Sequence, residues 1–189
     1  LSAMTGLKTI VLSMPIKQKK NKNHLSLKNK EWLIKNFMEE LLSPDDVFGY
    51  AELVNRVGEK GEGWTRIACG EHEYTEHGFN VLVALGSAEI LQPDITWCGG
   101  TTAGRRISAL VEGAGLELIP HRGASSWGFP IALTSPSCSM AESFPEGSAI
   151  LDAMSCRVED GYVLAPSKPG FGHSLTEEMV LDSRLRPEN

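Results

Sequence analysis

The sequence predicts an α/β fold in which β-strands alternate with α-helices on a parallel sheet. From residue 31 onward, short apolar runs, some rich in β-branched residues, alternate with segments of helical period. An ionisable residue stands directly after each of five such runs. With 189 residues, 41% of them hydrophobic, the chain also has enough apolar material for one globular core.

Five segments are predicted to be strands because each is a short apolar or strand-like run. These segments are residues 34–38, 65–69, 89–93, 116–120 and 138–141. Each is separated from the next by enough residues for one crossover helix, as a parallel sheet requires.

The clearest predicted helix covers residues 102–113. Three- and four-residue steps place one apolar face there, made of Ala103, Ile107, Leu110, Val111 and Ala114. Thr101 is the expected N-cap, and Gly113 and Gly115 are expected to end the helix. A second helix is expected over residues 76–85, closed by Gly86.

Charge is distributed unevenly along the chain. Residues 1–30 contain seven lysines and no Asp or Glu, so they carry +7, which leaves −13 for the rest of a chain whose net charge is −6. This break predicts a basic segment, residues 1–30, outside the main folded unit of residues 31–165, followed by a return segment and tail at 166–189. The Lys/Asn run at 17–24 contains no Arg and no aromatic residue, so a solvated tail is favoured over nucleic-acid binding.

The expected environment of the chain is the cytoplasm, with no membrane partner. No apolar stretch approaches the roughly 18 residues of a membrane span. The four cysteines lie far apart, without the spacing of a zinc site or the density of a disulfide-rich secreted domain. Reduced thiols follow from this pattern.

The residues that follow the predicted strands are Glu39, Glu71, Asp94, His121 and Glu142. Because the carboxyl ends of parallel strands meet on one face of a sheet, these groups are expected to share a site. Gathered carboxylates repel one another unless a cation lies between them, and oxygen ligands favour Mg²⁺, for which Glu39 and Glu71 are candidates. A His beside a carboxylate is a general base, which suits His121 with Asp94. Ordinary helix caps or solvated turns remain the alternative.

Several short motifs contain these residues. They are Met38-Glu39-Glu40, Ser43-Pro44-Asp45-Asp46, Gly70-Glu71-His72-Glu73, Gln92-Pro93-Asp94, Trp97-Cys98-Gly99-Gly100, Pro120-His121 and Pro169-Gly170-Phe171-Gly172. With these motifs the sequence resembles the mandelate-racemase-like branch of the enolase superfamily, from about residue 31 to the C-terminus. The resemblance implies the C-terminal half of a (β/α)₈ TIM barrel, about strands 4–8, without the N-terminal capping domain.

The resemblance also implies a site and a reaction. Glu39 and Glu71 would bind Mg²⁺, Asp94 and His121 would form a catalytic dyad, and Glu142 would act as an electrostatic or hydrogen-bonding group. His121 would take the proton α to the carboxylate of a sugar acid, and loss of water would give a 2-keto-3-deoxy sugar acid. His72 would contact the substrate, although an exposed turn histidine is an equally good interpretation.

Two departures from the family pattern bear on activity. The family's third metal ligand is an Asp on an earlier strand, and residues 1–30 contain no carboxylate to replace it. Arg122 follows His121 where the family has Gly, and a guanidinium pointing inward would lower the pKa of His121.

Half of a barrel would have two open sheet edges, which predicts a partner. That partner would be a second copy of the chain or a separate N-terminal half. Residues 7–14 would add one strand at an edge. A catalytically incomplete fragment that acts as an interaction module is therefore the alternative to an active dehydratase.

Overall fold

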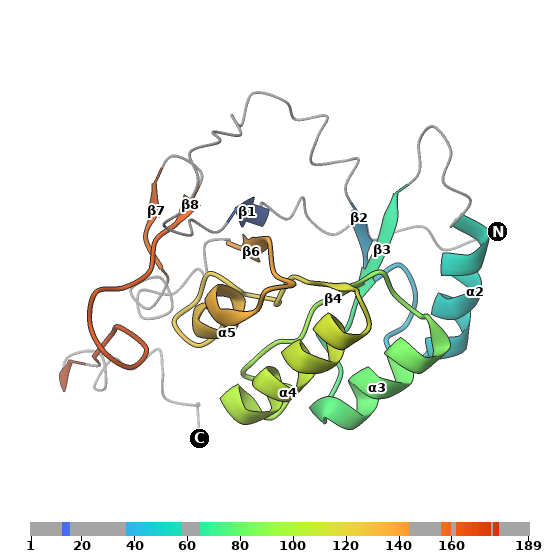
Figure 1. Ribbon diagram of the computed structural model, residues 1–189, viewed down its shortest axis with the longest axis horizontal. Coiled ribbons are helices and arrows are strands. Elements are labelled where there is room, and N and C mark those ends of the chain that lie inside the picture. The colour runs from blue at the N-terminus through green and yellow to red at the C-terminus, as the bar shows by residue number, and fades with distance from the viewer. Residues whose placement is uncertain are drawn as a thin grey trace, which may run out of the picture.

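The computed structural model describes residues 13–15, 37–57, 65–143, 156–159, 162–174 and 176–177, and these form an α/β fold (Figure 1). Four parallel strands make its central sheet, in the order β2–β3–β4–β5. Their bounds are β2 Phe37–Glu39, β3 Arg66–Cys69, β4 Ile90–Leu91 and β5 Glu117–Leu118. The prediction of an α/β fold with a parallel sheet is therefore confirmed.

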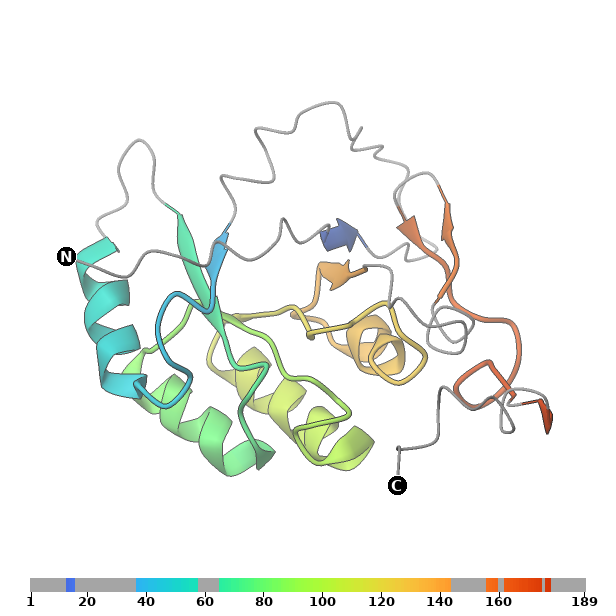
Figure 2. The same cartoon turned by 180° about the vertical axis from the view of Figure 1, so that it is seen from behind.

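A helix follows each of these strands along the chain. The helices are α2 Val47–Val57, α3 Thr75–Leu85, α4 Gly100–Gly113 and α5 Phe129–Thr134. Helices α2, α3 and α4 lie side by side along one face of the sheet in both ribbon views (Figures 1 and 2). Each helix must pack its apolar stripe back onto the sheet, and crossovers of one hand bring successive helices to the same face.

Alternation of side chains along the strands gives the sheet two apolar faces. Ile67 and Leu91 point into the larger core, where they join Phe79 of α3 and Ile107 of α4. All four side chains are fully buried. On the other face, Ala68, Ile90 and Ile119 form a smaller cluster with Met140, against which Phe37 packs. Both faces of the sheet are therefore apolar, as in parallel sheets covered on two sides.

The predicted 138–141 strand is present but is not a member of the parallel sheet. Strand β6, Met140–Glu142, pairs antiparallel with β1, Ser13–Pro15, with Met14 opposite Ala141. One backbone bond, from the N–H of Leu118 to the carbonyl of Ser137, still joins this segment to β5. Pro136 precedes that contact and has no N–H to donate, so it cannot extend a ladder beside β5.

Strand β1 overlaps the predicted edge strand at 7–14, of which residues 7–12 lie outside the described residues. It is also the described part of the basic 1–30 segment. Two further short strands, β7 Val158–Glu159 and β8 Tyr162–Val163, pair antiparallel with each other. The 166–189 segment is described only as far as residue 177.

Helix α3 ends as predicted at Gly86, whose φ of 64° is the left-handed conformation that favours glycine and whose N–H reaches the carbonyls of Leu82 and Val83. The start of α4 differs from the prediction. Gly99, with φ 111°, is the N-cap in place of Thr101, which lies inside the helix. Two successive glycines with positive φ turn the chain into this helix two residues earlier than a threonine cap at 101 would.

The apolar face of α4 is largely the predicted one, since Ala103, Ile107 and Val111 are buried. Ala114 is exposed because it is already the C-cap, so its inclusion in the buried face was wrong. The four cysteines are buried and free. No helix in the described part of the chain is long and apolar enough to cross a membrane.

Candidate active site

The five predicted site residues stand at or just after strand ends. Glu39 is the last residue of β2, and Glu142 is the last residue of β6. Glu71, Asp94 and His121 lie two or three residues beyond β3, β4 and β5. The strand topology therefore places Glu39, Glu71, Asp94 and His121 at the carboxyl ends of neighbouring parallel strands, where such sheets carry their sites. Glu142 joins them from β6, which lies outside the parallel sheet.

His121 lies at the centre of this group, with its two ring nitrogens facing different carboxylates. Nδ1 lies 2.9 Å from Oδ2 of Asp94, and Nε2 lies 3.2 Å from Oε2 of Glu71. Oε2 of Glu142 is 3.7 Å from Nε2. Burial by itself would lower the pKa of His121, but the hydrogen bond to Asp94 and the charges of Glu142 and Glu71 raise it to about 8.

Asp94 is held in turn by the chain that follows β4. Its Oδ1 accepts hydrogen bonds from the backbone N–H and the hydroxyl of Thr96, at 2.7 and 2.6 Å. Burial opposes ionisation of Asp94, but the hydrogen bonds from His121 and Thr96 outweigh it and hold the pKa of Asp94 below its usual range. The carboxylate is therefore charged and oriented, as the partner of a general base must be.

Glu142 is almost completely buried, with 2% of its surface exposed. Burial raises the pKa of Glu142, whereas the charge of His121 and the backbone N–H of Arg122, 2.6 Å from Oε2, lower it. The lowering of the His121 pKa that an inward-pointing Arg122 would cause stays a prediction. Overall the pKa of His121 is raised, because carboxylates surround the imidazole, and the charge of Arg122 lowers the pKa of Glu142.

Glu39 completes the group. Burial and the charges of Glu142 and Glu71 raise its pKa to about 7. Its buried Oε2 has no hydrogen-bond partner of good geometry among the described residues. The fully buried side-chain amide of Gln92 lies close enough to lower the pKa of Glu39, but less than burial raises it. A buried carboxylate oxygen with free lone pairs beside other carboxylates fits a cation, because a cation would relieve both the repulsion and the lost hydration.

The cation site within the described residues is incomplete. Glu39 and Glu71 supply oxygen ligands suited to Mg²⁺, but no set of three or more His, Cys, Asp or Glu side chains in that part of the chain has the geometry to hold a metal ion. The two predicted ligands therefore fit such an ion as part of a ligand set.

His72 lies at the edge of the site and is about half exposed, with 53% of its side chain accessible. Its Nδ1 is 3.5 Å from Oε1 of Glu71 and 3.6 Å from Oε2 of Glu40. Trp97 donates its ring N–H to the carbonyl of His72 at 3.2 Å, and the Trp97 ring packs on that of Tyr74 with centroids 5.3 Å apart. Contact of His72 with a substrate stays a prediction.

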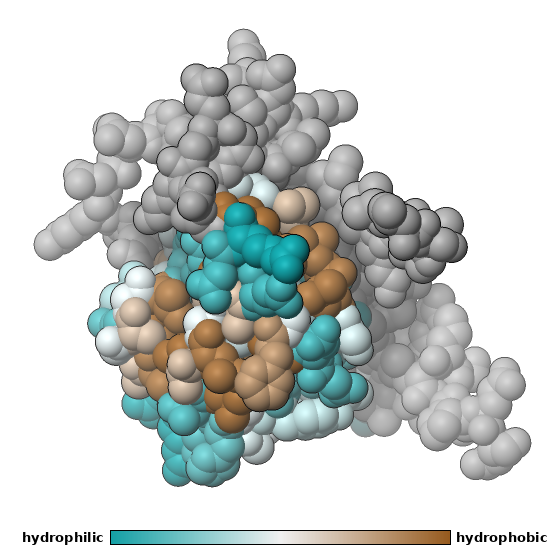
Figure 3. Space-filling model, turned by 90° about the vertical axis from the view of Figure 1, so that its right-hand side faces the viewer, coloured by the Kyte–Doolittle hydropathy of each residue, from teal (hydrophilic) through white to brown (hydrophobic). Residues whose placement is uncertain are grey.

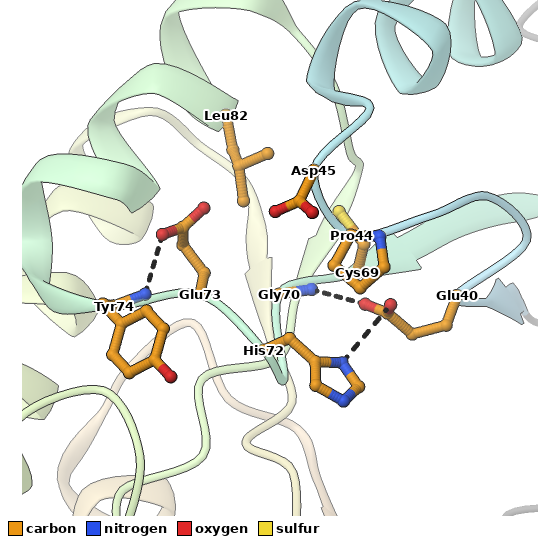
Figure 4. Close-up of a pocket in the computed structure, with 9 residues that line it drawn as sticks. All are labelled: Glu40, Pro44, Asp45, Cys69, Gly70, His72, Glu73, Tyr74 and Leu82. Atoms are coloured by element: carbon orange, nitrogen blue, oxygen red, sulfur yellow. Dashed lines mark hydrogen bonds and ion pairs between the residues drawn. The ribbon is translucent and has the colours of Figure 1, made fainter.

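A hollow of about 90 Å³ lies next to His72 (Figure 4). Residues of the β2–α2 and β3–α3 loops line it, among them Glu40, Asp45, His72 and Glu73. Small-molecule pockets usually have several hundred Å³, so this hollow is too small for a sugar acid.

The sequence analysis did not assign roles to Glu40, Gln92 or Thr96. Glu40 and Gln92 nevertheless belong to the motifs Met38-Glu39-Glu40 and Gln92-Pro93-Asp94. Thr96 is two residues from Asp94, the spacing at which an Asp side chain bonds the backbone ahead of it, so this contact had a recognisable signal. The role of Glu40 depends on a loop from another strand, which spacing along the chain does not reveal.

The chain belongs to the family described as enolase C-terminal domain-like, which matches residues 31–179. Among curated proteins, it is 34% identical over 154 residues to L-rhamnonate dehydratase of Saccharopolyspora erythraea, a match that covers 77% of this chain and 38% of that protein. The chain thus spans well under half the length of this relative. The resemblance to the enolase superfamily is confirmed.

Solved structures of the same superfamily are also similar. L-talarate dehydratase from Polaromonas sp. JS666, complexed with Mg and L-glucarate, aligns with a TM-score of 0.64 and 28% identity over 76% of this chain and 38% of that one. L-rhamnonate dehydratase from Gibberella zeae aligns with a TM-score of 0.62 and 26% identity over 78% of this chain and 39% of that one.

Proposed function

We propose that this chain carries the acid–base face of an acid-sugar dehydratase, with L-rhamnonate as the favoured substrate and L-fuconate, galactonate and related acids next. The observation that carries the proposal is the placement of His121, whose Nδ1 contacts Asp94 and whose Nε2 faces Glu71. The relatives named L-rhamnonate dehydratase support the substrate class.

The chemistry follows from the two ends of the imidazole. Asp94 holds Nδ1 and so fixes the orientation of the ring, which leaves Nε2 as the atom that takes the proton α to the substrate carboxylate. The electron pair of that C–H bond forms a C=C bond, and the β-hydroxyl leaves with a proton as water. The resulting enol becomes a 2-keto-3-deoxy acid when a proton is added to the carbon that lost the hydroxyl and the enol O–H gives up its proton.

Glu39 and Glu71 would hold the divalent cation that such a reaction needs. When bound, Mg²⁺ supplies positive charge that stabilises the negative charge left on the substrate carboxylate as the α-proton departs. In this proposal Glu142 donates or accepts a hydrogen bond near Nε2 of His121, and His72 contacts a substrate hydroxyl at the rim.

The fold proposed for the active species is a TIM barrel of which this chain forms part. Strand β2 is an end strand of the four-stranded sheet. Three large apolar side chains are well exposed on and after it: Met38 on the strand, Leu41 just beyond it and Phe48 on α2. Apolar side chains gather on the face at the α2 side of the molecule (Figure 3). A second copy of the chain or a separate N-terminal half would cover this surface and supply further barrel strands.

A turnover assay tests the proposal. Purified chain is incubated with Mg²⁺ and a panel of sugar acids, and the 2-keto product is measured as its semicarbazone. We expect turnover of L-rhamnonate that EDTA abolishes and His121→Asn removes, whereas His77→Asn, at an exposed position on α3, retains it. No product from any acid of the panel would count against the proposal.

A non-catalytic interaction module is the second candidate. The incomplete ligand set in the described residues favours it. The module predicts association without turnover, so the same preparation, examined by light scattering and by the semicarbazide assay, separates the two functions.

A further inference from the structure

Three non-glycine residues among those described have a left-handed backbone: Glu40, Thr75 and Arg122, with φ of 46°, 57° and 54°. Two of them directly follow site residues, Glu39 and His121. A positive φ costs conformational energy for a residue with a Cβ, so the surrounding contacts must hold it in place. For Glu40, those contacts lie on both sides of Glu71.

Glu40 reaches across from the end of β2 to the end of β3. Its backbone N–H donates to the carbonyl of Ala68 at 3.1 Å and so extends the pairing of the two strands by one bond. Its Oε1 accepts a hydrogen bond from the N–H of Gly70 at 3.0 Å, and its Oε2 lies 3.6 Å from Nδ1 of His72. Figure 4 shows the carboxylate of Glu40 between the Gly70 amide and the His72 imidazole.

Gly70 and His72 are the two neighbours of Glu71 in the sequence, so Glu40 contacts the chain on both sides of Glu71. The two oxygens of Glu71 in turn face two imidazoles: Oε1 lies 3.5 Å from His72, and Oε2 lies 3.2 Å from His121. When Glu40 fixes His72, His72 fixes Oε1 of Glu71, and Oε2 is left directed at His121.

We propose that Glu40 is a positioning residue that holds Glu71 in the orientation needed to face His121 and a cation. His72, which lies between Glu40 and Oε1 of Glu71, passes this restraint from one carboxylate to the other. This inference rests on the proposed function, because the orientation of Glu71 matters through its part in that site. It gives His72 a role beyond its predicted contact with substrate.

This position needs a side-chain oxygen that accepts the Gly70 N–H. The Glu40 side chain is only 18% exposed, and burial raises its pKa, while the hydrogen bond from Gly70 lowers it. A buried N–H left without an acceptor costs free energy, so a side chain that keeps an oxygen in this place should hold the Gly70 segment as well. The amide it binds is itself fixed, since Gly70 has φ 117° and packs against Phe79.

Amide hydrogen exchange followed by NMR tests the contact without metal or substrate. In Glu40→Ala, we expect exchange at the Gly70 amide to accelerate by on the order of tenfold. Glu40→Gln, which keeps an oxygen at the same place, should stay near the wild-type rate. The Gln92 amide, bonded to the carbonyl of Cys69 on the other side of β3, is the internal reference and should not change.

Glu73→Ala is the matched control variant. It removes a carboxylate that lines the same hollow, but the Glu73 carboxylate accepts from the N–H of Tyr74, at 2.7 Å. Exchange at Gly70 should be unchanged in this variant. Unchanged exchange in Glu40→Ala, or equal acceleration in Glu40→Ala and Glu73→Ala, would overturn the inference.

Calorimetric titration with Mn²⁺ tests the consequence for Glu71. We expect binding about fivefold weaker or worse in Glu40→Ala, and within about twofold of wild type in Glu40→Gln and Glu73→Ala. If Glu40→Ala accelerates exchange at Gly70 but leaves the Mn²⁺ affinity unaltered, the Glu40–Gly70 hydrogen bond exists but does not position Glu71, and the inference is wrong. If the wild-type chain binds no Mn²⁺, the cation part of the proposed function is wrong. The positioning role of Glu40 is then tested by crystal structures of the two Glu40 variants. The distance between Glu71 and His121 must lengthen in Glu40→Ala and be kept in Glu40→Gln.

Discussion

Oδ2 of Asp94 lies 2.9 Å from Nδ1 of His121, and this contact fixes which way the imidazole faces. The opposite nitrogen is then turned toward Glu71 and Glu142. A histidine held in this way between carboxylates keeps its proton to higher pH than a free one, although burial opposes this.

Asp94→Asn should therefore lower the pKa of His121 from about 8. The substitution removes the negative charge beside Nδ1 but leaves a carbonyl oxygen, so a decrease of about one pH unit is expected, which corresponds to about 1.4 kcal/mol. An NMR titration of the His121 ring protons measures it. Thr96→Val, which removes only the hydroxyl that supports Asp94, should have a smaller effect.

Asp94→Asn should also change how the stability of the fold depends on pH. Because the folded state raises the pKa of His121 above its ordinary 6.5, the stabilising contribution of this group is complete below pH 6.5 and is lost as the pH rises through about 8. Asp94→Asn should thus destabilise the fold more at pH 6 than at pH 9 in urea unfolding. A loss that is the same at both pH values would contradict this account.

Glu39→Gln is expected to stabilise the chain at alkaline pH. The folded state raises the pKa of Glu39 from 4.5 to about 7, so this state binds more protons than the unfolded chain between those values, and its stability falls as the pH rises through them. Replacing the carboxylate removes that loss, which amounts to about 1 to 3 kcal/mol above pH 7.

Urea unfolding of wild type and Glu39→Gln at pH 4 and at pH 8 checks this. The midpoints should be close at the lower pH, and the variant should be the more stable protein at the higher pH. Turnover, if the wild type has it, should be lost, because the neutral amide is a poorer ligand for a cation. A variant less stable than wild type at pH 8 would mean that the charge of Glu39 is already compensated.

Much of the site could be predicted from residues at the ends of apolar runs. Glu71, Asp94 and His121 follow strands by two or three residues, and parallel strands end on one face, so chain order alone predicts that they meet. The pairing of β6 could not be predicted in this way. Its partner, β1, lies far away in sequence, and no local pattern specifies which strand an edge will accept.

The start of α4 shows a second limit. Thr101 is a good N-cap by residue type, but the two glycines before it allow positive φ and begin the helix earlier. Glu40 shows a third, since its role comes from a hydrogen bond to Gly70 that spans two strands. Local preference predicts elements, whereas contacts between loops decide how the site is held.

Gly70→Ala should destabilise the fold by about 2 to 3 kcal/mol. Gly70 has φ 117°, and a Cβ there would lie 2.9 Å from Cε1 of the fully buried Phe79, so strain and overlap add. Gly86→Ala is the matched control, because its φ is also positive, at 64°, but a Cβ there meets nothing within 4 Å. It should cost only about 1 kcal/mol. Thermal unfolding of both variants measures the difference, and equal losses would show that overlap with Phe79 is relieved.

Association of the chain tests the proposed partner surface. Met38, Leu41 and Phe48 are 40%, 43% and 73% exposed, and unpaired strand edges with apolar neighbours favour self-association. We expect light scattering after size exclusion to show oligomers, and a variant with lysine at all three positions to weaken association by about tenfold or more. Val81→Lys, at a position 45% exposed on α3, should leave association unchanged. A wild-type chain that is a stable monomer over the whole accessible concentration range would contradict the proposal, because these exposed apolar side chains would then need no partner.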